Sequence, residues 1–126
     1  MLIWELFEGF AASYTPSNSD ETIGTRLKHY LEQNYHQKDL SLTMVAEVFK
    51  LSPTYLSSTF KSAYGQGVLE YLNQVRIDHA KALLTETDIP IAEISDRTGF
   101  SNYTSFSRVF KRITGISAKD YRNKKI

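Results

Sequence analysis

The stretch GFSNYTSFSRVFKRITG, residues 99–115, combines a glycine turn with an amphipathic helix. The apolar residues of that helix recur at the spacing of one stripe on a 3.6-residue helix: Phe106, Val109, Phe110 and Ile113. A shorter stripe at Ile91, Ile94 and Ser95 precedes it, and Gly99 between the two suits a tight turn with positive φ. The pattern therefore predicts two short helices joined by a tight turn.

Hydroxyl and cationic side chains occupy the outer side of the second of these helices. We call these residues the second polar face: Tyr103, Thr104, Ser107, Arg108 and Lys111. A polar outer side is ordinary for an amphipathic helix. This one lacks carboxylates, however, and residues 101–126 hold seven basic residues against one acidic residue. Because such side chains bond base edges and phosphate oxygens, the pattern favours contact with the major groove of double-stranded DNA.

The same unit occurs earlier in the chain. Ser52 before Pro53 predicts the start of a helix that ends near Tyr64. Its predicted inward residues are Leu56, Phe60 and Ala63. Its outer residues, which we call the first polar face, are Thr54, Ser57, Ser58 and Lys61.

An offset of 50 residues relates the two units. It superposes Ser57 on Ser107, Phe60 on Phe110, Lys61 on Lys111, Gly65 on Gly115 and Tyr71 on Tyr121. Before the second helix of each unit the offset becomes 49, which pairs Leu51 with Phe100. Two copies are too few for a solenoid, so we interpret them as a duplicated helix pair.

Three further helices complete an all-α prediction. One begins near Ser19 or Asp20 and ends near Tyr35, and another spans residues 42–49 after a capping Ser41. A long helix at residues 67–86 has this apolar face: Val68, Leu69, Leu72, Val75, Ala80, Leu83 and Leu84. It spans roughly 30 Å, close to the roughly 34 Å between successive major-groove turns on one side of DNA. We therefore expect a spacer between two DNA-reading units.

The expected organisation divides the chain into four parts. Residues 19–66 form the first helix-turn-helix subdomain, residues 67–86 the linker helix and residues 87–126 the second subdomain, both subdomains being homeodomain-like. Residues 1–18 are an amphipathic helix with a linker. We expect that helix to be the remnant of an upstream sensing or dimerisation domain, to pack on a second copy in a homodimer, or to fold back onto this domain.

Several spaced elements resemble the signature of the AraC/XylS family of bacterial transcription regulators. They are RIDHAKALL at residues 76–84, IPIAEI at 89–94, GFS at 99–101, FSRVFK at 106–111, Gly115 and Tyr121. The likeness covers about residues 21–122. It implies a DNA-binding domain with two helix-turn-helix units whose second helices read adjacent major-groove segments. It also implies transcription regulation, commonly activation through RNA polymerase.

The resemblance also implies DNA contacts by particular residues. It places the first polar face on DNA with Lys61 near phosphate, and the second polar face with Lys111 and Arg112 near the backbone. This chain departs from the family pattern at Lys50, where a small residue or glycine is common. Ser57 and Ser58 are also short for base contacts, so we expect Arg108 to carry more base discrimination.

Composition excludes other classes of function. The chain has no cysteine, which rules out disulfides and thiolate metal sites and fits a reducing compartment, so we expect a cytoplasmic protein. Its histidines lack ligand partners, no catalytic, phosphate-loop or dinucleotide motif occurs, and no apolar run approaches roughly 20 residues. We therefore expect no metal, no cofactor, no enzyme activity and no membrane span. A helical protein-binding module and, less strongly, an RNA-binding domain remain alternatives.

Overall fold

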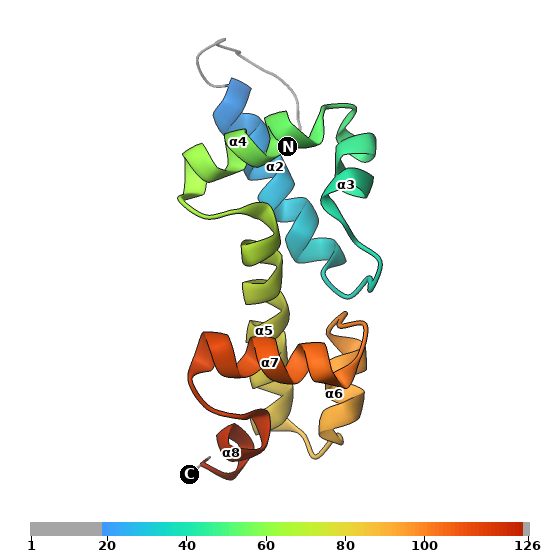
Figure 1. Cartoon of the computed structure of the whole chain (residues 1–126), viewed down its shortest axis with the longest axis vertical. Coiled ribbons are helices and arrows are strands. Elements are labelled where there is room, and N and C mark those ends of the chain that lie inside the picture. The colour runs from blue at the N-terminus through green and yellow to red at the C-terminus, as the bar shows by residue number, and fades with distance from the viewer. Residues whose placement is uncertain (1–18, 125–126) are drawn as a thin grey trace, which may run out of the picture.

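The computed structural model describes residues 19–124 of the 126-residue chain. Its helices are α2 (Ser19–Asn34), α3 (Leu42–Phe49), α4 (Pro53–Tyr64), α5 (Val68–Glu86), α6 (Ile91–Arg97), α7 (Tyr103–Thr114) and α8 (Ala118–Asn123). Figure 1 shows an elongated molecule with α5 as its axis. We call α2, α3 and α4, at one end, the first lobe, and α6, α7 and α8, at the other, the second lobe. The all-α prediction is confirmed, and the helix predicted near the N-terminus lies outside the described residues.

Side-chain caps start the helices where the sequence predicts. Ser41 and Ser52 each accept a hydrogen bond from the backbone N–H three residues further on, and Pro53 opens α4. Each cap satisfies a backbone donor that has no partner inside the helix. The predicted bounds of α3 and α4 are therefore confirmed.

Each lobe has its own apolar core, and α5 contributes to both. The first core contains Leu27, Leu31, Leu56, Phe60, Val68 and Leu72 among its buried residues. The second contains Ile77, Ala80, Leu84, Ile94, Phe106 and Phe110. The N-terminal half of α5 thus packs in the first lobe and its C-terminal half in the second, which ties the positions of both lobes to one helix.

Two residues predicted to be buried are exposed. Leu69 keeps 54% of its surface accessible, because it directly follows the buried Val68 and successive helical side chains point about 100° apart. Ala63 is exposed at the edge of the contact between α2 and α4, where it lies opposite Gly24. Because Leu69 is exposed, the buried face of α5 is narrower than the sequence predicts.

Helix α8 has no counterpart among the predicted elements. Ser117 caps it by accepting a hydrogen bond from the backbone N–H of Asp120 at 3.0 Å. The offset of 50 also maps the start of α8 onto the start of α5, since Ala118 corresponds to Val68. The pairing of Tyr71, which lies in the first turn of α5, with Tyr121 therefore indicated a helix here.

Arg76, in the middle of α5, connects the two lobes. Its Nε donates to the carbonyl of Tyr35 and its Nη2 to the carbonyl of Gln37, both at 2.8 Å. The guanidinium carbon lies 5.6 Å from the centre of the Phe100 ring. Burial lowers the pKa of Arg76, but a guanidinium remains cationic at neutral pH. The loop after α2 is thereby held against the turn that follows α6.

Gly99 allows this close approach of the lobes. Its φ is +96°, and a Cβ added there would lie 2.3 Å from the carbonyl oxygen of Tyr35. Both the backbone conformation and the space therefore require glycine. The positive φ predicted for this turn is confirmed.

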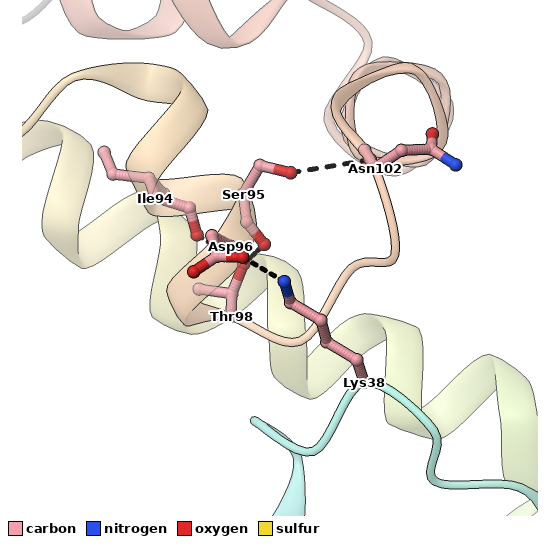
Figure 2. Close-up of polar contacts among 6 residues, drawn as sticks. All are labelled: Lys38, Ile94, Ser95, Asp96, Thr98 and Asn102. Atoms are coloured by element: carbon pink, nitrogen blue, oxygen red, sulfur yellow. Dashed lines mark hydrogen bonds and ion pairs between the residues drawn. The ribbon is translucent and has the colours of Figure 1, made fainter.

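Two further contacts join the lobes beside Arg76. Figure 2 shows Lys38, from the loop after α2, directed at Asp96 on α6, with which it forms an ion pair. The Tyr35 ring stacks on His79 of α5 with its centroid 3.9 Å away. The same view shows Ser95 directed at the carbonyl of Asn102, 3.5 Å away, which ties α6 to the start of α7.

Candidate nucleic-acid interface

The two helices that carry the polar faces match each other in length and position. α4 and α7 each have 12 residues and begin 50 residues apart. In Figure 1, α4 crosses in front of α2 and α7 crosses in front of α5, so both lie on the side of the molecule nearest the viewer. They are separated along α5, whose 19 residues span roughly 28 Å.

The first polar face lines one surface hollow. Thr54, Ser57, Ser58 and Lys61 all border it, together with Leu42, Pro53 and Ser62. Thr54, Ser58 and Lys61 are exposed and Ser57 is half-buried. The four predicted residues therefore share one accessible surface made of hydroxyl groups and one cation.

The second polar face lines a separate hollow on α7. The bordering residues are Tyr103, Thr104, Ser107, Arg108, Lys111 and Arg112, all of them predicted site residues. Ser107 is half-buried and the other five are exposed. The buried residues Phe106 and Phe110 hold the opposite side of α7 in the second core, which directs the polar side outward.

The cations of the two polar faces are available to a ligand, unlike Arg112, which borders the second hollow. Among the residues that the structure describes, Lys61, Arg108 and Lys111 form no ion pair. Arg112 differs, because its Nη1 lies 3.2 Å from a carboxylate oxygen of Glu70 in the first turn of α5. The positive charge of α7 that has no ion-pair partner among the described residues is therefore that of Arg108 and Lys111.

Both helices end in the same way. Gly65 and Gly115 cap them with φ values of +77° and +90°, and each N–H donates at 2.8 Å to a carbonyl four residues earlier. The turns before them differ, because Lys50 has a φ of +59° where the other unit has Gly99. Lys50 is the only non-glycine residue with positive φ among those described. The first unit thus makes its turn with a residue that tolerates this conformation poorly.

Two neighbours of the polar faces were not predicted. Ser62 borders the first hollow. The offset of 50 aligns Ser62 with the predicted site residue Arg112, so the repeat identifies it as well. Glu70 pairs with Arg112 over 42 residues of sequence, a contact that no local pattern indicates. The surface around α7 therefore includes a carboxylate contributed by α5.

Metal-binding clusters and membrane-spanning helices are both absent from the described residues. Within residues 19–124 no cluster of three histidine, aspartate or glutamate side chains could hold a metal ion. None of the helices in that range is both long and apolar enough to cross a membrane.

Comparisons with known proteins agree with this geometry. The helix-turn-helix domain family matches residues 45–124. An uncharacterized HTH-type transcriptional regulator from Staphylococcus aureus is 43% identical over 93 residues, which are 74% of this chain and 12% of that protein. This chain therefore spans only a small part of that relative.

Solved structures share the fold. The C-terminal domain of AraT, a response regulator from Geobacillus stearothermophilus, is 36% identical with a TM-score of 0.81, over 82% of this chain and 86% of that one. A transcriptional regulator from Chromobacterium violaceum, described among AraC-type DNA-binding domain-containing proteins, is 25% identical with a TM-score of 0.74, over 82% and 92% of the two chains.

Proposed function

This chain belongs to the AraC-type helix-turn-helix family of DNA-binding transcription regulators, and we propose that it grips duplex DNA with α4 and α7 together. In this proposal the two helices enter successive major-groove segments on one side of the duplex. The observation that carries it is the pair of matching polar hollows, one on α4 and one on α7. These two helices lie on the same side of the molecule, one in each lobe. The helix between them, α5, is itself roughly 28 Å long, which is close to one helical turn of B-DNA.

Within each face the residue types suit different parts of DNA. Lys61 and Lys111 contact phosphates, where a point charge is sufficient. Arg108 reads a base edge, because a guanidinium can bond guanine bidentately. The hydroxyl groups of the first polar face bind bases through water, since serine side chains are too short for most direct contacts. Arg112 contacts phosphate only when Glu70 releases it.

The regulatory outcome that we propose is activation, with RNA polymerase as the protein partner. The family resemblance supports this outcome, and transcription in vitro from a promoter carrying the selected site checks it. More transcript on adding the full-length protein supports activation, whereas less transcript contradicts it. A homodimer of the whole protein, the other expected partner, would form through segments outside the described residues.

Selection of binding sites from random duplexes, followed by affinity measurement across salt concentrations, tests DNA binding. Removing one phosphate contact makes the negative slope of log affinity against log salt less steep by about 0.9. We expect that reduction for Lys61→Ala and again for Lys111→Ala. Lys81→Ala is the matched control, because Lys81 lies on α5 and lines neither hollow. Slopes that do not change in either variant, or that change equally in the control, contradict the proposed phosphate contacts.

A further inference from the structure

The first lobe has a groove between α2 and α3 that lies apart from both polar faces. Its volume is about 550 Å³, and none of the residues of either polar face lines it. That volume is within the range of pockets that enclose ligands, roughly 300–1,000 Å³. The groove is therefore large enough for several apolar side chains.

Three of the side chains that line this groove are aliphatic or aromatic: Tyr30, Val48 and Phe49. Val48, on the rim, keeps 57% of its surface exposed. Phe49 is half-buried, its ring centre lies 5.7 Å from that of Tyr30 in an edge-to-face arrangement, and the Arg26 guanidinium carbon lies 5.2 Å from it. An exposed aliphatic residue beside an accessible aromatic ring marks a surface that gains free energy when it is covered.

We propose that residues 1–14 of this chain, MLIWELFEGFAASY, dock into the groove between α2 and α3. The segment is rich in apolar residues, and its charged side chains are Glu5 and Glu8, with no lysine or arginine. The groove lining contains Arg26 and His29 and no carboxylate. Segment and groove are thus complementary both in apolar character and in charge.

The chain is long enough to make this contact. α2 begins at Ser19, and Arg26 lies seven residues further on, roughly 10 Å along the helix axis. Residues 15–18 reach up to roughly 14 Å when extended. A segment of fourteen residues spans roughly 21 Å as a helix, which is long enough to fold back beside α2 and reach the groove.

The only tryptophan of the chain, Trp4, lies in this segment and reports on docking directly. In the full-length chain we expect blue-shifted tryptophan emission and slow quenching by acrylamide. Val48→Asp places a charge on the groove rim without touching a buried residue. It should shift the emission to the wavelength of solvent-exposed tryptophan and raise the quenching constant several-fold.

Leu69→Asp is the matched control, because Leu69 is 54% exposed and lies on α5 outside the groove. It should leave emission and quenching unchanged, and circular dichroism should show both variants to be folded. A complementary variant, Phe7→Asp in the segment, should reproduce the effect of Val48→Asp with the groove intact.

Two results would overturn the proposal. Trp4 emission of a fully exposed indole in the unaltered chain shows that the segment is not docked. A blue shift that disappears on dilution shows that the segment binds a second copy of the chain instead of its own groove. A shift that persists on dilution and is abolished by Val48→Asp but not by Leu69→Asp supports docking within one chain.

Discussion

Lys50 holds a backbone conformation that ordinarily belongs to glycine. Its φ of +59° brings its Cβ close to the backbone, and the corresponding residue of the second unit is Gly99. For a residue with a Cβ this conformation costs about 1–2 kcal/mol. Replacing it with glycine removes this cost, but glycine loses more conformational entropy on folding, which offsets part of the gain in stability. The site therefore stores strain at the turn that positions α4.

We expect Lys50→Gly to raise the free energy of unfolding by roughly 0.5–1 kcal/mol. Denaturation by urea, followed by circular dichroism, measures this change. Lys61→Gly is the comparison, because it places glycine inside α4 and should lower stability by about 1 kcal/mol. A loss of stability at both positions would mean that Lys50 makes a compensating contact.

Arg108 is the residue of the second polar face best suited to base recognition. It is exposed, it forms no ion pair within residues 19–124, and it projects from α7 beside Ser107 and Lys111. Removal of a bidentate contact with guanine costs about 1–3 kcal/mol on the correct sequence.

Arg108→Ala should therefore weaken binding to the selected duplex by about that amount and relax preference at one base pair. Competition among duplexes that vary at single positions measures the effect. An equal loss of affinity on every duplex would instead identify Arg108 as a phosphate contact.

At the scale of elements, the ion pair between Glu70 and Arg112 joins the start of α5 to the last turn of α7. Both side chains are about half exposed, so the pair adds little stability. The pair also affects the proposed interface, because Glu70 holds Arg112, the neighbour of Lys111, in an ion pair and so keeps it from a phosphate.

Glu70→Gln should release Arg112 for a phosphate and steepen the salt dependence of DNA affinity by about 0.9 in the log–log slope. Glu93→Gln is matched to it, since Glu93 is similarly exposed and pairs with Arg97 inside α6. The change should vanish when Arg112 is also replaced by glutamine. A steeper slope that persists in the double variant would show that Arg112 is not the group released.

The helices were largely predictable from sequence, because their signals are local. Ser41 and Ser52 cap the helices that they precede, and Gly99 has the positive φ predicted for its turn. The polar faces were predictable for the same reason, since residues on one side of a helix follow from spacing alone. Their contact with DNA stays a prediction.

Contacts between distant segments were not predictable. Arg76 donates hydrogen bonds to backbone carbonyls 39 and 41 residues away. Every residue has a backbone carbonyl, so the sequence does not indicate which ones accept. Leu69 was predicted to be buried but is exposed, because hydrophobicity alone cannot distinguish which of the adjacent residues Val68 and Leu69 packs in the core. Helix α8 is short, and its six residues carry too few apolar positions for periodicity to detect.

At the scale of the whole molecule, Arg76 makes the two lobes one unit. Arg76→Met should lower the free energy of unfolding by about 2–4 kcal/mol, because the carbonyls of Tyr35 and Gln37 lose a charged donor. Amide hydrogen exchange should then show the second lobe opening separately from the first. Arg97→Met, at an exposed site on α6, should leave exchange in both lobes as it was. Uniform protection in both variants would mean that α5 and the other contacts between the lobes, Lys38 with Asp96 and Tyr35 with His79, couple them without Arg76.

The central claim is that α4 and α7 hold one side of a duplex at the same time. Methylation interference on the selected binding site tests it most directly, because guanine N7 lies in the major groove. We predict two clusters of sensitive guanines with centres about 10–10.5 base pairs apart. A single cluster, or two clusters separated by about half a helical turn and so on opposite sides of the duplex, would contradict the claim.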